Sequence, residues 1–452
     1  MEDIKIEILP NLYLKEDGTF DLEKALQMSG KIAGLCYAKT SFHDILEEDK
    51  DKTLRRIENT LSNGHHSVYD HIWISFYIKN IPKILAMVLN NEKQYTTSEK
   101  SLRYTPIDDS LDVSVEEKKA YYKWLEIMKD KIGTKYGEVF SKTKIKTLAQ
   151  ENARNFISVF MPTQMVYSTT LRQINNLCSF MQNYYVISNK DDSFEGKLAT
   201  SMGAMMKEFQ KLNVLDDRLM GNDKNRNLSL FGSNLGDKKN YFGDLYEVTY
   251  DGTYAELAQA QRHRTLDYQM ERKKDKSYFV PPIIESDPAL ATEWLTDMMK
   301  ISNLNVTPIG EMITIRESGS YQNFILKCKE RLCSNAQLEI MLQTRKTLLE
   351  YMDALKESNP VLYEDIKKLE VIAKKKYMST GSPLAYETYV SDFKFTFKDG
   401  QTFYFYWPMI LNDDARYIAT IVEKKVEYIE DPYNILYAMK QGINLNDYLI
   451  GR

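Results

Sequence analysis

Residues 63–71 read Asn-Gly-His-His-Ser-Val-Tyr-Asp-His, and residues 72–78 continue as Ile-Trp-Ile-Ser-Phe-Tyr-Ile. The second stretch is rich in β-branched and aromatic residues, which predicts a buried strand. Pro82 is then well placed as an early residue of a helix that runs to about Leu89. The polar motif therefore comes directly before a strand and a helix, and we work outward from this unit.

The order of predicted elements is similar before and after residue 216. The spacing of apolar residues predicts helices over 21–36, 52–63, 117–132, 143–158, 171–185 and 194–212, and a strand over 163–170. A polar stretch, 216–237, has the composition of a linker or long loop. A strand over 245–250, a turn at Asp251-Gly252, helices over 254–264 and 288–301, a strand over 311–317 and a helical region over 321–357 follow. This recurrence suggests duplication followed by divergence.

We therefore predict an α+β protein made of two fused halves. The first half would span 1–215 and the second 216–377, each with a mixed or antiparallel sheet flanked by helices. The remainder, 378–452, is predicted to be a β-rich extension. Within it, residues 393–406 alternate around Asp-Gly, which is a strong hairpin signal.

Composition narrows the class of function. The 452 residues carry a net charge of −4, so no global basic field favours nucleic acid. No apolar stretch is long enough to span a bilayer, and the N-terminus lacks a secretory pattern, so we expect a cytoplasmic protein without membrane partners. The four cysteines form no Cys-x-x-Cys pair, which fits buried thiols in a reduced compartment and no metal site.

Two motifs in the first half have side chains suited to a nucleotide. Four of the five histidines fall within the motifs discussed in this section, but His-Glu-x-x-His spacing is absent, so zinc is disfavoured. Ser101 and Arg103 lie two residues apart on a predicted loop, where a hydroxyl and a guanidinium can reach one phosphate. Taken alone, the histidine motif also fits a capped helix end, and Arg103 also fits a solvated loop.

Two further motifs follow in the second half. Gln259 precedes Arg262-His263-Arg264, in which two guanidiniums flank an imidazole and offer donors to a phosphate or diphosphate. A basic helix end is the simpler interpretation of this motif. Arg331 precedes Ala336-Gln337-x-Glu339-Ile340, and it also fits a surface arginine beside core residues.

Together, over roughly residues 20–345, these motifs resemble those of the flavin-dependent thymidylate synthases. The resemblance implies methylation of dUMP at C5 with methylene-tetrahydrofolate, while NADPH reduces FAD. It implies dUMP-binding roles for Glu99, Ser101, Arg103, Arg154, Gln259, Arg262 and Arg331, with Arg262 and Arg331 also expected to be catalytic. It implies FAD-binding roles for His65, Ser67, Asp70, His263 and Arg264, with Asp70 standing where the family usually has Glu.

Each half keeps the motifs that the other lacks. The position of Arg-His-Arg is occupied in the first half by about Asn91-Glu92-Lys93, and the position of Ser-x-Arg-Tyr falls within 271–275 in the second half. In the family these two sets belong to different subunits of one site. We therefore expect a composite site, and a homodimer that mimics the family's homotetramer.

One departure leaves alternatives open. The Asn-x-Arg pair of the family is replaced by about Gln173 and Asn175 in the first half, and by Ser320 and Gln322 in the second. One alternative is an enzyme that adds another one-carbon group, such as hydroxymethyl, to a pyrimidine nucleotide. A second is an inactive relative that binds nucleotide or acts as a scaffold. No cysteine lies in a Pro-Cys-His context, which argues against a cysteine nucleophile.

Overall fold

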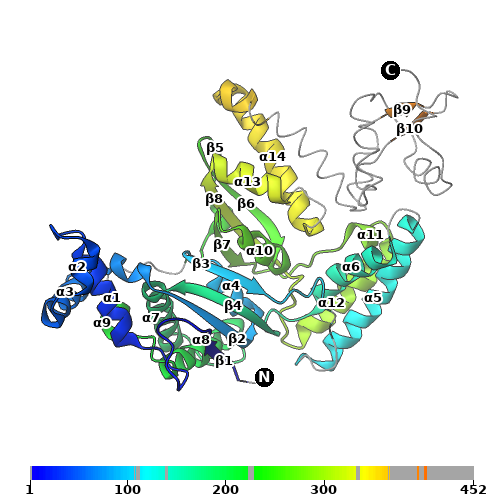
Figure 1. Ribbon diagram of the computed structural model, residues 1–452. Helices are drawn as coiled ribbons and strands as arrows, with labels where there is room; N and C mark the ends of the chain where they lie inside the picture. The colour runs from blue at the N-terminus through cyan, green and yellow to red at the C-terminus, as the bar shows by residue number, and fades with distance from the viewer. Residues whose placement is uncertain are drawn as a thin grey trace.

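The computed structural model describes residues 3–105, 107, 112–137, 141–221, 229–331, 336–364, 366, 394–396 and 402–404. Two four-stranded sheets form its centre, and the strands pair in the antiparallel sense in both (Figure 1). The first sheet has the order β1 (Lys5–Ile8), β2 (Trp73–Pro82), β4 (Pro162–Thr170), β3 (Tyr95–Glu99). The second has the order β5 (Tyr241–Phe242), β6 (Leu245–Thr253), β8 (Met312–Ser320), β7 (Asp267–Arg272). The predicted α+β class, with one antiparallel sheet in each half, is confirmed.

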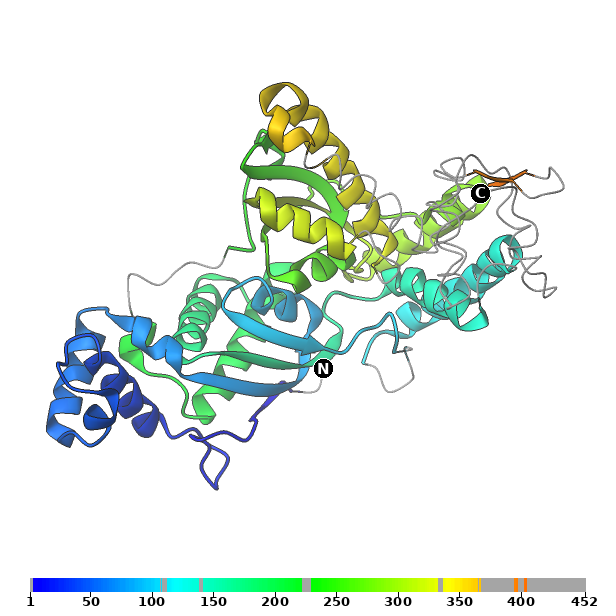
Figure 2. The same ribbon diagram turned by 45° about the horizontal axis from the view of Figure 1, so that its top comes forward.

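Helices surround both sheets. Those of the first half are α1 (Leu22–Gly34), α2 (Phe42–Leu46), α3 (Lys50–Ser62), α4 (Lys83–Leu89), α5 (Val115–Tyr136), α6 (Lys142–Ala153), α7 (Leu171–Ile187), α8 (Phe194–Lys211) and α9 (Asp217–Met220). Those of the second half are α10 (Tyr254–Ala260), α11 (Pro282–Glu285), α12 (Pro288–Asn303), α13 (Tyr321–Arg331) and α14 (Leu338–Ser358). In Figures 1 and 2, α5, α6, α11 and α12 gather on one side of the sheets, away from α1, α2 and α3.

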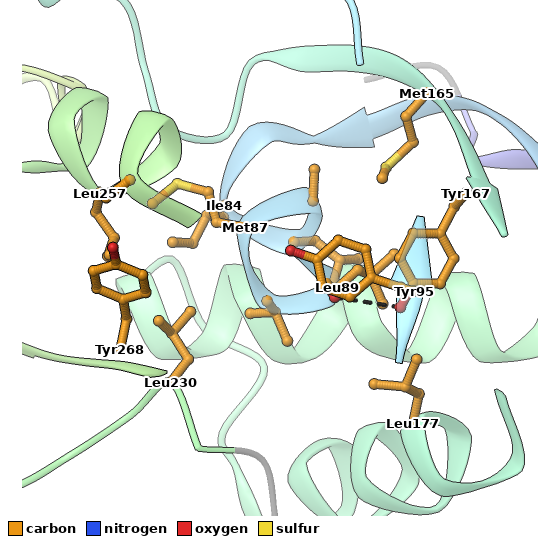
Figure 3. Close-up of a cluster of buried hydrophobic side chains, with 14 of the residues drawn as sticks. Ile84, Met87, Leu89, Tyr95, Met165, Tyr167, Leu177, Leu230, Leu257 and Tyr268 are labelled. Carbon is orange, nitrogen blue, oxygen red and sulfur yellow. Dashed lines mark hydrogen bonds between the residues drawn. The ribbon is translucent and has the colours of Figure 1, made fainter. Parts of the chain in front are cut away.

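Helix α4 lies in the core between the two halves. Strand β2 alternates as expected of a half-buried strand and leads directly into α4, whose residues after Lys83 are all buried. Figure 3 shows Ile84 and Met87 of α4 beside Leu257 of α10 and Tyr268 of β7. One apolar core therefore extends through both halves.

Reciprocal backbone bonds join the segments that precede β4 and β8. The Val159 amide donates to the Thr307 carbonyl at 2.8 Å, and the Ile309 amide donates to the Ile157 carbonyl at 2.7 Å. Such a reciprocal pair is typical of antiparallel pairing. The two sheets are thus connected through equivalent segments of the two halves.

The sheets also match in register. Pro82 pairs with Pro162 at the start of β4, and Thr253 pairs with Met312 at the start of β8. Three residues further along each strand, Met165 pairs with Glu99 and Ile315 with Met270. Helices α4 and α10, and strands β3 and β7, therefore occupy equivalent positions in their sheets.

The predicted turn at Asp251-Gly252 is wrong. Both residues lie within β6, where Gly252 pairs with Ile313. A Cβ atom at residue 252 would lie 2.3 Å from Glu256 Oε2. The glycine therefore provides room for a neighbouring side chain rather than a chain reversal.

Other boundaries differ from the predictions. The helix predicted over 143–158 ends at Ala153 and continues as the 3₁₀ helix η2 (Arg154–Phe156), because the backbone beyond it pairs with the second half. The helix predicted over 254–264 divides into α10 and η4 (Gln261–His263). The region predicted over 321–357 contains α13 and α14, with 332–335 outside the described residues. The stretch over 216–237 contains α9 and η3 (Leu235–Asp237), with 222–228 outside the description.

Two remaining expectations concern the tail and the thiols. The predicted hairpin is confirmed as β9 (Lys394–Thr396) paired with β10 (Thr402–Tyr404), and the rest of 378–452 lies outside the described residues. Cys178 and Cys328 are buried as expected, but Cys36 is exposed, and Cys333 lies outside the description. Within the part of the chain that is described, no helix is both long and apolar enough to cross a bilayer.

Candidate functional site

A small cavity lies between the loop that follows β3 and helix α10. Its walls include Ser101 and Arg154 from the first half and Gln259 and Arg262 from the second. Its volume of about 30 Å³ accommodates two or three water molecules, which suits one small polar group rather than a whole nucleotide. The structure thus brings four of the sequence-predicted residues, two from each half, to one place.

Arg103 lies beside this cavity without lining it. Its backbone amide donates to Ser101 Oγ at 3.3 Å, and its Nε donates to Glu151 Oε2 at 2.5 Å in a buried ion pair. Arg103, Tyr104 and Glu151 line a larger cavity of about 270 Å³, bounded also by α6, α11 and the start of α14. The loop from Ser101 to Tyr104 is therefore shared by the two cavities.

Arg154 is held at the end of α6. Its Nε donates to the Glu151 carbonyl at 3.1 Å, and a terminal nitrogen donates to Gln337 Oε1 at 2.9 Å. Burial, together with the nearby charges of Arg103 and Arg262, lowers the pKa of Arg154 to about 10. The side chain therefore still carries its charge at neutral pH.

Helix α10 positions Gln259 and Arg262. The hydroxyl of Thr253 caps this helix by accepting from the Glu256 amide at 3.0 Å. A guanidinium nitrogen of Arg331 donates to the Gln259 carbonyl, so the sequence-predicted Arg331 is tied to the same helix. Arg262 is half-buried, and among the described residues no carboxylate lies within ion-pair distance of it.

Lys83 is a lining residue that the sequence reasoning missed. Its Nζ lies 2.5 Å from Glu99 Oε1, and the Glu99 side chain is only 2% exposed. Burial lowers the pKa of Lys83, and the positive charges of Arg262 and Arg154 act in the same direction. In the sequence, Lys83 is the lone charged residue at the start of the apolar run Lys-Ile-Leu-Ala-Met-Val-Leu. None of the motifs described above includes it.

The start of α14 connects the residues from both halves. Gln337, which accepts from Arg154, donates to Glu339 Oε2 at 3.2 Å, and the Leu338 amide donates to Glu151 Oε1 at 3.2 Å. Glu339 also accepts from the Thr253 hydroxyl at 2.7 Å. One short segment therefore orients both Arg154 and the N-terminus of α10.

Two buried carboxyl groups meet at this junction. Burial raises the pKa of Glu339 to about 7, and burial with the nearby Glu339 charge raises the pKa of Glu256 well above its ordinary value. Both carboxyl groups therefore favour the protonated, neutral form more than an ordinary glutamate does.

The residues expected to bind the cofactor do not gather around the small cavity. His65 and Ser67 are exposed at η1 (His66–His71), and the side chain of His263 lies outside what the structure describes. Asp70 accepts from the Thr170 hydroxyl at 2.8 Å and from Arg172 at 3.0 Å. None of His65, Ser67 and Asp70 lines the small cavity.

Asp70 and Arg172 instead line a separate polar hollow of about 80 Å³. Lys93 and Gln94 also line it, and Arg264 donates to the carbonyl of the next residue, Tyr95, at 3.0 Å. Among the described residues, the buried atoms Arg172 Nε and Asn176 Oδ1 have no hydrogen-bond partner. The donor set of this hollow therefore fits a polar or anionic ligand group.

The departure noted in the sequence has a structural explanation. Asn175 is fully buried, donates to the carbonyls of Leu171 and Val214, and accepts from the Asp216 amide. All its polar groups are therefore used within the protein. Gln173 lines the polar hollow with Asp70 and Arg172.

The equivalent position in the other half is filled by the protein's own side chains. By sheet register, Arg272 occupies the place of Ser101, and it pairs with Glu195 at 3.1 Å and lies over the Phe194 ring at 4.4 Å. Asn91, which occupies the place of Arg262, donates to the Tyr268 carbonyl at 3.0 Å and to Ser229 Oγ at 2.9 Å. A cavity lined by several cations, of which Arg262 has no carboxylate partner among the described residues, is therefore found at one of the two equivalent positions. Across the described part of the chain, no cluster of three or more His, Cys, Asp or Glu side chains could hold a metal.

Comparison with known proteins identifies one family. The model described as thymidylate synthase complementing protein matches residues 22–184. No curated protein matches the chain. Among solved structures, the chain is similar to the UMP/dUMP methylase PolB from Streptomyces cacaoi bound with 5-Br dUMP, at 13% identity and a TM-score of 0.31, covering 49% of this chain and 94% of that chain.

The chain is also similar to the flavin-dependent thymidylate synthase ThyX from Helicobacter pylori. One structure of it, complexed with FAD and dUMP, has 18% identity and a TM-score of 0.26, covering 44% of this chain and 92% of that chain. A second, also with FAD and dUMP, has 17% identity and a TM-score of 0.24, covering 46% and 99% of the two chains.

Proposed function

We propose that this chain methylates dUMP at C5 to give dTMP, because residues 22–184 match the thymidylate synthase complementing protein model. Methylene-tetrahydrofolate would donate the one-carbon group and NADPH would be the reductant. FAD, when bound, would pass the electrons of NADPH to the transferred one-carbon unit, which must be reduced from the methylene to the methyl level. The protein's own task is then to bind the nucleotide, orient it and balance its charge.

The observation that carries this proposal is the composite cavity. Ser101 and Arg154 from one half face Gln259 and Arg262 from the other, and Arg262 has no carboxylate partner among the described residues. A half-buried guanidinium without a counter-ion strongly favours an anion. We assign this cavity to the 5′-phosphate of dUMP.

Arg331 supports the same assignment. It is buried and donates to the Gln259 carbonyl, so its charge lies at the C-terminal part of the helix that also carries Arg262. A buried cation next to the nucleotide can stabilise negative charge that develops on the pyrimidine ring. In the proposed reaction, Arg331 and Arg262 are the residues that act electrostatically on the substrate.

The polar hollow is the proposed site for part of FAD. Arg172 and Arg264 offer guanidinium donors on either flank of the segment from Lys93 to Tyr95, which suits a diphosphate. Asp70 holds Arg172 in place through its ion pair at 3.0 Å. His65, Ser67 and His263 remain predicted contacts of the cofactor.

A cysteine nucleophile has no support. Burial raises the pKa of the Cys178 and Cys328 thiols, which disfavours the reactive thiolate. Of the described cysteines, none lines the composite cavity. Replacing all four cysteines by serine or alanine is therefore expected to leave turnover present.

A second candidate is a relative that binds nucleotide without flavin chemistry. The complete internal bonding of Asn175 favours it, because this side chain has no polar group left for a cofactor. A related one-carbon transfer, such as hydroxymethylation, would use the same phosphate site.

Two measurements test these proposals. Purified protein incubated with FAD should show a flavin spectrum after gel filtration. With methylene-tetrahydrofolate and NADPH added, it should convert dUMP to dTMP while releasing the hydrogen at C5. A protein that binds dUMP but neither binds FAD nor releases that hydrogen would support the second candidate. A product whose mass differs from that of dTMP would indicate a different one-carbon group.

A further inference from the structure

Lys83 lies in the same cavity as the predicted nucleotide-binding residues, yet it belongs to none of their motifs. It begins the otherwise apolar helix α4, and its side chain is 15% exposed. Its place in the second half is taken by Tyr254, which also lines the cavity but carries no charge at neutral pH. The lysine is therefore a charge that one half contributes and the other does not.

The residues around the cavity carry more positive than negative charge. Lys83, Arg154 and Arg262 line it as cations together with the exposed Lys100, and Glu99 is the carboxylate paired with Lys83. Without Lys83, the buried Glu99 carboxylate would lie uncompensated next to the two arginines and would repel an entering phosphate. With Lys83, the Lys83–Glu99 pair is neutral, and the charges of Arg154, Arg262 and the exposed Lys100 remain to balance a phosphate dianion.

We infer that Lys83 is an anion-binding residue of this cavity, which neutralises Glu99 and contacts the phosphate of the nucleotide. The inference rests on the proposed function for the identity of the nucleotide, but the anion chemistry follows from the cavity itself. It identifies the ligand class as a phosphate monoester dianion. A nucleoside, or a phosphate methyl ester with one charge, should bind more weakly.

Calorimetric titration with dUMP and with inorganic phosphate tests the inference. Lys83→Met should weaken dUMP binding about tenfold or more, because it removes a cation and exposes the charge of Glu99. Lys83→Met combined with Glu99→Gln should recover part of that loss, since the repelling charge is also gone. The matched control is Lys79→Met, because Lys79 pairs with Glu7 on the exposed side of β2 and should leave binding unchanged.

The outcomes separate the two proposals. Unchanged dUMP affinity in Lys83→Met, while Arg262→Ala weakens it, would overturn the role of Lys83 and leave the proposed function intact. A loss in Lys83→Met that the second substitution does not recover would contradict the neutralisation of Glu99. Wild-type protein that binds phosphate through Lys83 but does not bind dUMP would retain the anion site and reject the proposed substrate. Wild-type protein that binds neither would overturn the inference.

A measurement on the unmodified protein covers the case in which Lys83→Met does not fold. Reductive methylation of lysines, read by mass spectrometry, should label Lys83 more slowly when inorganic phosphate is present. Lys79 should be labelled at the same rate with and without phosphate. Equal labelling of Lys83 in both conditions would overturn the inference.

Discussion

At the scale of single residues, the most informative group is the carboxyl pair of Glu256 and Glu339. Both are buried at the junction of the halves, where Glu339 accepts from Thr253 and from Gln337. Because Gln337 also accepts from Arg154, two hydrogen bonds connect Glu339 to this arginine, which is proposed to bind the phosphate. This position predicts a measurable effect of pH on stability.

Burial raises the pKa of Glu339 from 4.5 to about 7. Because the pKa of Glu339 is higher in the folded than in the unfolded protein, its protonated form stabilises the fold. This contribution is fully present below about pH 4.5 and is lost as pH rises through 7. Glu339→Gln, which cannot ionise, should remove this dependence, and the difference should be on the order of 2 kcal/mol between pH 5 and pH 8. Urea unfolding of both proteins at several pH values measures it. Parallel pH profiles for the two proteins would contradict the assignment.

Gly252 provides a second prediction at this scale. A methyl group there would meet Glu256 Oε2 at 2.3 Å, within a strand that cannot shift without breaking its pairing with β8. Gly252→Ala should therefore lower the free energy of unfolding by about 1–3 kcal/mol. The control is Gly236→Ala, because a Cβ atom there meets nothing within 4 Å. Equal stability of the two variants by chemical denaturation would show that Glu256 can move aside.

At the scale of elements, the N-terminus of α10 is the point on which the composite site depends. Thr253 accepts from the Glu256 amide at 3.0 Å and donates to Glu339 at 2.7 Å, so one hydroxyl fixes both α10 and α14. Thr253→Val keeps the shape but loses both bonds, and it should cost roughly 1–2 kcal/mol and weaken nucleotide binding. Thr253→Ser keeps the hydroxyl and should remain close to the wild type in thermal unfolding. If Thr253→Ser were as unstable as Thr253→Val, the two hydrogen bonds of the hydroxyl would not explain the stability at this position.

Long elements could be predicted from the sequence, and short or composite ones could not. Apolar periodicity correctly predicted α7, α8 and α12, while the β-branched and aromatic run predicted β2 and the position of Pro82 predicted α4. Strands β1, β3, β5 and β7 were missed, since their residues pair with distant strands and carry little alternation of their own. The predicted turn at Asp251-Gly252 was wrong because the glycine is needed to make room for the Glu256 side chain. This contact depends on the folded structure and cannot be recognised from the dipeptide.

The candidate site was partly predictable for the same reason. The motifs singled out Ser101, Arg154, Gln259 and Arg262, and in the structure these four residues line one cavity. They did not predict that Arg103 forms a buried ion pair with Glu151, or that Lys83 joins the cavity, because these contacts connect segments far apart in the chain. They singled out Asp70, which lines the polar hollow, but not Arg172 beside it.

At the scale of the whole molecule, the two sheets have the same strand order and register but different charges at their equivalent positions. We propose that the halves arose by duplication, which the matched register and the reciprocal bonds between Val159, Thr307, Ile309 and Ile157 support. The boundary near residue 216 and the homodimer that mimics a family tetramer remain predictions. Sedimentation of the purified chain tests the dimer, and a strict monomer that still turns over would contradict it.

The measurement that tests the composite site most directly is a calorimetric titration of dUMP into four proteins. The wild type should bind one nucleotide per chain. Ser101→Ala in the first half and Arg262→Ala in the second should each weaken binding, the latter by about one to two decades because it removes a charged partner. Arg272→Ala, at the equivalent position that the protein's own side chains fill, should leave the affinity and the stoichiometry unchanged. Two nucleotides per chain, or full affinity in both Ser101→Ala and Arg262→Ala, would contradict a single site built from both halves.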